Sequence, residues 1–421
     1  MATSALNTSN TYWFETLRVR RGTLFYVLCL VTIASGYYLY WGLWKLKAYF
    51  IAWGLCLVIA IAMLLANHLR ARRVLLDMLP VLVWYGYLAA SALWSPSPGT
   101  TLFYVGAALV NPVAFLVSYA WARSTSEWSF SSFFELQAVL ILPIVFWYLF
   151  TIGHMYDDKL GAVRTGFAAS CLIALPFLIW RARKRPGIKS VVVLLAAFAL
   201  ILTSDSRSGL VVMPVLLFGA LFFVGQSRLS FSRSTAAVFV LLGTLVLAVV
   251  SIPALRDAFL HSLGRFSSTS SQFSISSSIL DEMARPAEGQ VDIARRLQLF
   301  IALRSFLSHP LLGGGYQSTY AIISNQFGWE VSAHGLPSTL LGETGLVGTA
   351  IFIWMIVRFY RRIGSEASLG SPHEIGFVST CKLTMFGLLL LGLFHQVDQG
   401  QPLFVLLGWA YAMPAPVSQR A

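Results

Sequence analysis

One histidine and one carboxylate stand where a long apolar stretch begins. His334 and Glu343 belong to the segment HGLPSTLLGETGLVG (334–348). A histidine near neutral pH is the usual general base, and an acid within an apolar stretch is costly enough to indicate a role. Their nine-residue separation puts them about 180° apart on a helix. We therefore take His334 as the candidate base, with a structural histidine as the alternative, and expect a structural role first for Glu343.

Arginines in two separate segments are suited to holding phosphate. Arg207 lies among hydroxyl residues in TSDSRSG, and Arg295 and Arg296 lie in DIARRLQLFIALRSFLSHP (292–310), with the isolated Arg265 upstream. A guanidinium is permanently charged and forms paired hydrogen bonds to phosphate oxygens. The alternative is that these side chains reach lipid headgroups at a membrane boundary.

A glycine-rich turn, HPLLGGGY, follows the second of these segments. Three consecutive glycines, Gly313 to Gly315, allow close backbone approach to a ligand, and their N–H groups can form an anion-binding nest. No GK[ST] follows, so the turn is not a P-loop. The chain also lacks a DxD pair, an HExxH motif and a cysteine cluster. We therefore predict chemistry without a metal or a cofactor.

The composition of the whole chain excludes a water-soluble enzyme. Of its 421 residues, 57% are hydrophobic and 11% are charged, whereas a soluble domain has about 25% charged residues. The apolar runs are continuous rather than alternating, so helices are favoured over an outer-membrane barrel. Runs of about 20 residues predict twelve spans: 24–44, 49–67, 74–94, 101–121, 132–152, 165–181, 190–204, 209–225, 235–252, 336–358, 376–397 and 401–415.

The basic residues predict how these spans are oriented. With a cytoplasmic N-terminus, the cytoplasmic segments hold 18 Lys and Arg residues and the short outer loops hold 5. That asymmetry follows the positive-inside rule. Both termini are then cytoplasmic, the first span is expected to stay uncleaved, and the net charge of +13 mostly reflects orientation rather than nucleic-acid binding.

One outer connection is much longer than the others. The predicted organisation is spans 1–9 in residues 1–252, a large outer loop in 253–335 and spans 10–12 in 336–421. Within the loop, the serine-rich run 267–278 is predicted to be flexible. Segment 292–310 has near-helical apolar spacing and ends at Pro310 and the glycines. We predict an amphipathic helix that lies on the outer membrane surface or caps the bundle.

The ordered set of motifs resembles the bacterial O-antigen ligase and polymerase superfamily. SRSG, a large outer loop, an arginine-bearing helix, HPLLGGGY and His334 with LLGETGLVG follow one another between residues 203 and 348. Gly335 departs from the family pattern, which often has Asn after the histidine. The resemblance implies an all-α polytopic bundle of GT-C-like architecture, with about 12 transmembrane helices and amphipathic helices in a large periplasmic loop.

The resemblance also implies an activity in lipopolysaccharide assembly. It is a metal-independent, inverting transfer of a glycan from undecaprenyl diphosphate to a lipid A-core sugar, at the periplasmic face of the bacterial inner membrane. His334 would be catalytic, and Arg207, Arg296, Arg265 and Arg295 would bind the diphosphate. Supporting positions would be Arg164, Gly313, Gly315, Tyr316, Glu343 and Asp398. The expected partners are the lipid-linked donor, the lipid A-core acceptor and membrane lipids, with no nucleic acid and no cofactor.

Two alternatives stay open. A polymerase would transfer the glycan to a second lipid-linked repeat, although the compact loop and short C-terminus favour the ligase. A transporter or flippase for a lipid-linked glycan would share the spans and the outer arginines. It would also need ionisable residues deep in both halves, and only Lys382 and Glu343 are midspan candidates.

Overall fold

The computed structural model describes eight stretches of the chain and a few isolated positions between them. The stretches are 71–122, 161–184, 188–203, 207–223, 290–327, 335–367, 372–394 and 401–412. These residues form helices and turns, and no strand occurs among them. The all-α class is therefore confirmed for this part of the chain. The predicted spans 24–44, 49–67, 132–152 and 235–252 lie wholly or mostly outside the described residues, so the number of about twelve stays a prediction.

The N-terminal helices in this part follow the apolar runs but are more interrupted than expected. They are α3 (Ala71–Ala90), the short 3-10 helix η1 (Ser91–Leu93), α4 (Pro98–Ala108) and α5 (Val110–Ala122). The run 101–121 was expected to be one helix, yet α4 ends before Leu109. Pro112 explains the break, because proline has no N–H for the carbonyl four residues earlier and its ring clashes with it.

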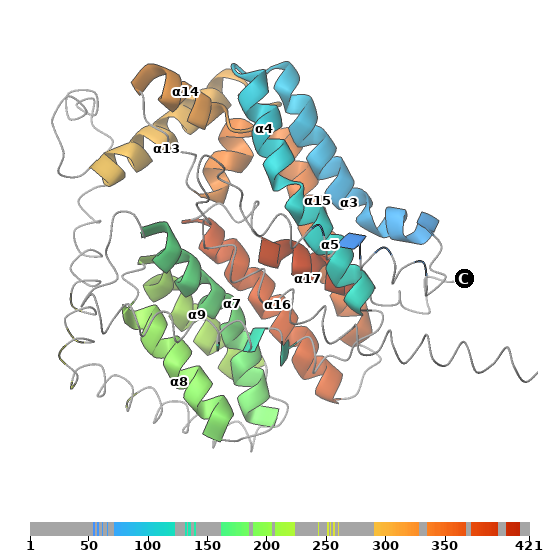
Figure 1. Cartoon of the computed structure of the whole chain (residues 1–421), viewed down its shortest axis with the longest axis vertical. Coiled ribbons are helices and arrows are strands. Elements are labelled where there is room, and N and C mark those ends of the chain that lie inside the picture. Colours follow the sequence, from blue (N-terminus) through green and yellow to red (C-terminus); the bar gives the residue numbers. More distant parts are fainter. Residues whose placement is uncertain are drawn as a thin grey trace, which may run out of the picture.

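Five of the remaining bundle helices agree with predicted spans to within a few residues. They are α7 (Gly161–Lys184), α8 (Ile188–Thr203), α9 (Arg207–Phe223), α16 (Pro372–Gly392) and α17 (Gln401–Ala412). The other helix, α15 (Gly345–Ala367), begins nine residues after the start of its predicted span, 336–358. Helices α7, α8 and α9 pack together, α3 packs on α15, and α5 packs on α17. Figure 1 shows α16 between the group of α7, α8 and α9 and the helices α3, α5 and α17. Aromatic side chains fill the contacts, as where the Trp84 and Phe352 ring centroids lie 5.4 Å apart between α3 and α15.

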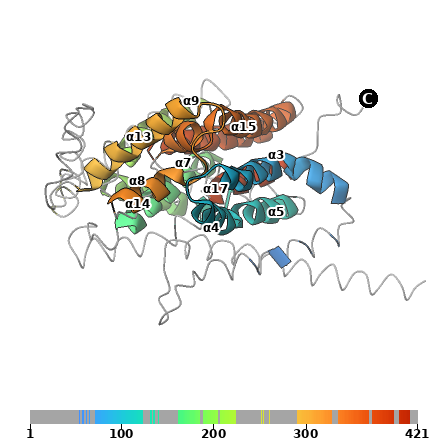
Figure 2. The same cartoon turned by 90° about the horizontal axis from the view of Figure 1, so that it is seen from above.

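Two helices of the predicted outer loop cover one end of this bundle. They are α13 (Gln290–Ser308) and α14 (Ser318–Phe327), which lie at the upper end in Figure 1, and Figure 2 looks down on that end. The predicted helix over 292–310 is thus present. Its apolar residues divide between two sides, because Leu297 and Ile301 are buried against Ile323 of α14 whereas Phe300 and Leu307 are exposed.

The tenth predicted span begins differently from a regular helix. Ser338–Glu343 forms a π-helix, η3, and the chain turns at Thr344 before α15 begins at Gly345. A π-helical turn inside an apolar helix frequently marks a functional site. Glu343, expected inside the span, therefore lies at the break in front of α15.

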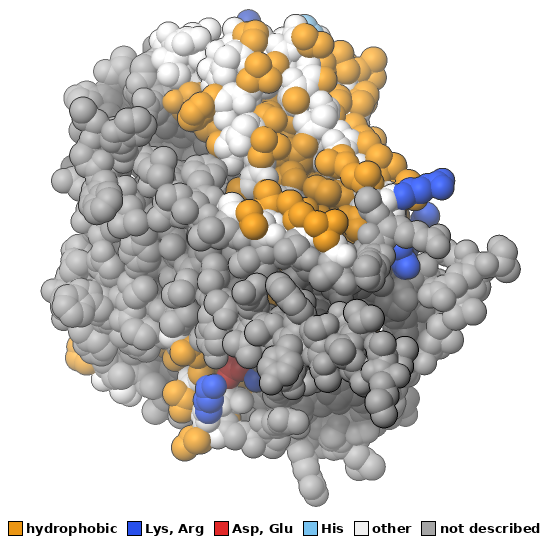
Figure 3. Space-filling model, turned by 45° about the vertical axis from the view of Figure 1, so that its right-hand side comes forward, with side chains coloured by type: hydrophobic (Ala, Val, Ile, Leu, Met, Phe, Trp, Pro, Cys, Tyr) orange, Lys and Arg blue, Asp and Glu red, His pale blue; other side chains and the backbone are white. Residues whose placement is uncertain are grey.

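The bundle surface is strongly apolar where it is described. Two helices in this part, Arg72–Leu93 and Pro98–Ala122, are long and apolar enough to cross a membrane, and five shorter helices are also apolar. Figure 3 shows hydrophobic side chains covering much of the described face that it displays. An extended apolar surface of this kind fits contact with lipid.

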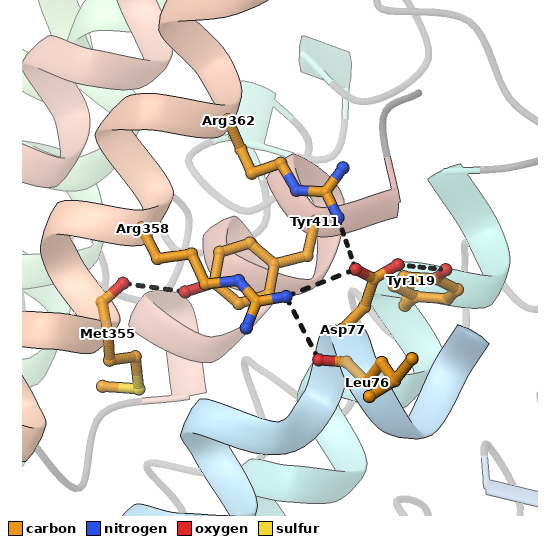
Figure 4. Close-up of polar contacts among 7 residues, drawn as sticks. All are labelled: Leu76, Asp77, Tyr119, Met355, Arg358, Arg362 and Tyr411. Carbon is orange, nitrogen blue, oxygen red and sulfur yellow. Dashed lines mark hydrogen bonds and ion pairs between the residues drawn. The ribbon is translucent and has the colours of Figure 1, made fainter. Parts of the chain in front are cut away.

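A buried carboxylate near the N-terminus of α3 connects four helices of the bundle. Asp77 is 3% exposed and forms ion pairs with Arg362 and Arg358 of α15, at 2.5 and 3.6 Å. Its other oxygen accepts a hydrogen bond of 2.9 Å from the Tyr119 hydroxyl of α5, and the Arg358 guanidinium lies over the Tyr411 ring of α17 (Figure 4). We call these five residues the Asp77 cluster. It fixes α3, α5, α15 and α17 to one another.

Removing the charge of Asp77 should destabilise the bundle. We expect Asp77→Asn to lower the free energy of unfolding by about 2 kcal/mol, because both arginines lose their counter-charge in a mostly buried place. Thermal unfolding of the purified protein in detergent measures this. The matched control is Tyr119→Phe, which removes one hydrogen bond and should cost about 1 kcal/mol. Equal stability of Asp77→Asn and the wild type would show that the cluster contributes nothing.

Candidate active site

The glycine-rich turn packs backbone against backbone on the break in front of α15. We call residues 310–316 together with 342–348 the glycine junction. Because both segments expose unpaired peptide groups, they hydrogen-bond to each other as two short strands of backbone would. Four bonds connect them: Gly314 N to Gly342 O, Gly315 N to Glu343 O and Leu346 N to Pro310 O, all 2.9 Å, and Val347 N to Leu311 O, 3.0 Å.

Glycine is required at the centre of this junction. Gly313 and Gly345 have φ values of +68° and +63°, a left-handed conformation that L side chains rarely adopt. A Cβ on Gly345 would lie 2.5 Å from the nitrogen of Gly313 and from the carbonyl oxygen of Leu311. The two segments approach this closely because neither residue has a side chain.

The junction also holds α13, the helix that carries Arg295 and Arg296. The Ser305 hydroxyl donates a hydrogen bond of 2.9 Å to the Gly342 carbonyl. A Cβ on Gly342 would lie 2.6 Å from the Cβ of Ala302. Helix α13 is therefore in backbone contact with the segment that follows His334, and the two predicted parts of the site are rigidly connected.

Side chains of α3, η1 and α4 fasten the junction from the other side. The Tyr87 hydroxyl lies 2.6 Å from the Thr344 carbonyl, the Ser91 hydroxyl accepts a bond of 2.9 Å from Tyr316 N, and the Thr101 hydroxyl donates one of 2.7 Å to Tyr316 O. Tyr316 itself is buried. The sequence analysis did not predict that these three hydroxyl residues contact the site, because a hydroxyl in an apolar span gives no local signal of its distant partner.

Glu343 is fully buried within the junction. Its carboxylate accepts a hydrogen bond of 2.9 Å from the backbone N–H of Gln317, and its carbonyl accepts the bond from Gly315. Gln317 has a φ of +61°, uncommon for a residue other than glycine. The carboxylate thus holds the chain where it turns from the glycines into α14.

Polar side chains with no hydrogen-bond partner in the described part of the chain follow this turn. The Gln317 amide and the Ser318 and Thr319 hydroxyls are all buried at the start of α14. An unpaired buried amide costs about 1–3 kcal/mol. The sequence analysis included Tyr316 among the supporting positions but not its neighbour Gln317. A polar residue directly after GGGY is the only local sign that this position belongs to the site.

The variant Gln317→Met tests whether the Gln317 amide stabilises the folded chain or is instead available to bind a ligand. Methionine keeps the unbranched shape, so we expect the free energy of unfolding to stay the same or to rise by up to about 2 kcal/mol. Differential scanning fluorimetry in detergent measures it. Thr344→Val, which removes a hydroxyl bonded at 2.7 Å to Leu340 O, is the control and should lower stability. A loss in Gln317→Met comparable to the control would mean that the amide has a partner in the folded chain.

The register of α9 against α16 brings the distant parts of the site to one end of the bundle. A Cβ on Gly219 would touch the Leu383 side chain, and one on Gly387 would touch Leu216, so the helices run antiparallel. Arg207, the first residue of α9, therefore lies at the level where α16 ends. Gly335 packs at that same end, with a Cβ position 3.0 Å from the Leu393 carbonyl.

The backbone conformation at position 335 explains why glycine stands there, where the family that the sequence resembles often has Asn. Its φ is +96°, and the space for a side chain is limited by the last carbonyls of α16. Glycine satisfies both conditions at once. The residue directly after His334 is thus fixed against the end of α16.

The structure describes the predicted site residues to different extents. Gly313, Gly315, Tyr316 and Glu343 come together in the glycine junction. Arg164, Arg207, Arg295 and Arg296 lie within the first two turns of α7, α9 and α13, and only their backbone is described. His334, Arg265 and Asp398 lie outside the described residues. In the described part of the chain, no group of three or more His, Cys, Asp or Glu residues is arranged to hold a metal ion.

Comparison with models of protein families relates part of the chain to a known family. Residues 191–353 match a family model described as O-antigen ligase. The matched range begins in α8 and includes α9, α13, the whole glycine junction and His334. No curated protein matches the chain.

Proposed function

We propose that this chain is an O-antigen ligase, because residues 191–353 match the family model of that description. It would transfer a glycan from undecaprenyl diphosphate to a sugar of lipid A-core at the periplasmic face of the inner membrane. The bond between the first sugar carbon and the phosphate oxygen breaks, and a bond to the acceptor hydroxyl oxygen forms on the opposite face. The hydroxyl proton goes to His334, and undecaprenyl diphosphate leaves.

The observation that carries this proposal is the meeting of three distant segments at one end of the bundle. The N-terminus of α9 with Arg207 and the residue after His334 both lie at the end of α16. Helix α13, with Arg295 and Arg296, is bonded to the glycine junction beside them. In the proposed reaction, cations at this end would stabilise the departing diphosphate, and His334 would take the proton of the acceptor hydroxyl.

The arginines would act on the leaving group. Breaking the sugar–phosphate bond leaves negative charge on the diphosphate, so Arg207 and Arg296, with Arg295 and Arg265, would stabilise that charge as it develops. A fixed donor at such a charge commonly lowers the activation barrier by about 3–4 kcal/mol. This electrostatic stabilisation would supply what a metal ion supplies in other glycosyl transfers.

The rival functions differ in what the chain does with the same donor. A polymerase would use a second lipid-linked repeat as the acceptor, and a transporter would move the donor across the membrane unchanged. The family match supports an enzyme over a transporter. The preference for the ligase over the polymerase rests on the length of the outer loop predicted over residues 253–335.

A transfer assay with two acceptors distinguishes these functions. Purified protein receives undecaprenyl-diphosphate glycan and either lipid A-core or a second lipid-linked repeat, with EDTA and without it. The ligase forms product only with lipid A-core, whereas product only with the second repeat identifies a polymerase. Product lost on adding EDTA contradicts the metal-independent mechanism. No transfer to either acceptor, together with movement of the donor across vesicles, identifies a transporter.

A further inference from the structure

Arginines gather around the ends of α3 and α15 that lie away from the glycine junction. Arg72 and Arg73 begin α3 and are exposed, as is Arg361 near the end of α15. Arg358 and Arg362 add two more charges within the Asp77 cluster. The two helix ends carry five arginines against the acids Asp77 and Glu366, an excess of three positive charges.

These arginines belong to one surface rather than to two. Asp77 is one helical turn after Arg73, so the two positions lie on the same side of α3. Arg362, paired with Asp77, directly follows Arg361 in α15, and Arg358 donates a hydrogen bond of 3.1 Å to the Leu76 carbonyl. The exposed cations of both helices therefore flank the Asp77 cluster.

An exposed apolar surface adjoins the cations on both helices. On α3 the side chains of Leu75, Leu76 and Leu79 are 57%, 51% and 42% exposed. On α15 Trp354 and Val357 are 41% and 40% exposed. Figure 3 shows Lys and Arg side chains at the edge of a broad hydrophobic face. Cations next to apolar side chains match a molecule with an anionic head and hydrocarbon chains.

We propose that this surface of α3 and α15 binds an anionic phospholipid. The phosphate lies among Arg72, Arg73 and Arg361, and the acyl chains follow Leu75, Leu79, Trp354 and Val357. Basic surfaces between spans on the cytoplasmic side attract anionic headgroups, and the charge excess selects them over zwitterionic ones. Asp77 and Tyr87 are ten residues apart, so the surface lies about 15 Å along α3 from the glycine junction. This inference is independent of the proposed reaction.

Native mass spectrometry of the full chain in detergent tests the proposal, with phosphatidylglycerol and phosphatidylcholine as probes. We expect phosphatidylglycerol to be retained and phosphatidylcholine to be lost. In a triple variant with Arg72, Arg73 and Arg361 each changed to Gln, binding should weaken by about fivefold per arginine, on the order of a hundredfold in total. These three lie outside the Asp77 cluster, and unfolding temperatures confirm that the variant folds.

A second triple variant controls for charge alone. Changing Lys189, Arg256 and Arg304 to Gln removes the same three charges elsewhere and should alter binding by less than about twofold. Equal loss in both variants would show nonspecific attraction and overturn the proposal, as would undiminished binding in the first. Glycerol 3-phosphate, which lacks acyl chains, should compete poorly. Competition equal to that of phosphatidylglycerol would show a simple phosphate site instead.

Discussion

Replacing His334 with alanine is expected to lower the rate of glycan transfer by about 10²–10⁴-fold, the usual contribution of a general base. The variant keeps every arginine, so donor binding should be nearly unchanged. The loss should therefore appear in kcat rather than in KM, because the proton moves only in the transition state. Single-turnover transfer with saturating donor and lipid A-core measures it.

His309→Ala is the matched control for this experiment. His309 is the histidine at the end of α13, its side chain is exposed, and only its backbone groups hold the turn, accepting from Gly313 N and donating to Ser305 O. We expect its rate to stay within about threefold of the wild type. Full activity of His334→Ala would remove the assignment of the base while leaving the family match of residues 191–353 unaffected.

Adding one methyl group at Gly345 should open the glycine junction. The left-handed conformation costs an alanine about 1–2 kcal/mol, and the new Cβ would lie 2.5 Å from backbone atoms of Gly313 and Leu311. Backbone held by four hydrogen bonds cannot move aside, so we expect Gly345→Ala to cost about 2–5 kcal/mol in total. Transfer should fall with it, because α13 is positioned through this junction.

Gly86→Ala provides the comparison for that loss. Gly86 lies within α3, and nothing lies within 4 Å of its Cβ position. Alanine there should raise stability by about 0.5–1 kcal/mol through its higher helix propensity. Thermal unfolding and transfer rates are measured for both variants. If the two alanines behaved alike, the close approach at Gly345 would have no energetic consequence.

Local patterns in the sequence predicted most of the helices. Continuous apolar runs located α3, α7, α8, α9, α16 and α17 to within a few residues, because span length and side-chain polarity are local properties. The same reasoning did not find the break at Leu109 or the π-helix before Gly345. The apolar character continues through both, and the second break depends on hydrogen bonds to the glycine-rich turn.

The sequence by itself determined the chemical groups of the candidate site, the all-α class of the described part and the order of motifs that the family match supports. Only the tertiary structure decided how these motifs are held. Tyr87 and Thr344 are 257 residues apart, and Ser91 and Tyr316 are 225 apart. The antiparallel register of α9 and α16, which brings Arg207 to the level of Gly335, is equally long-range. Residue spacing encodes contacts within one helix, whereas these contacts depend on how whole helices pack against each other.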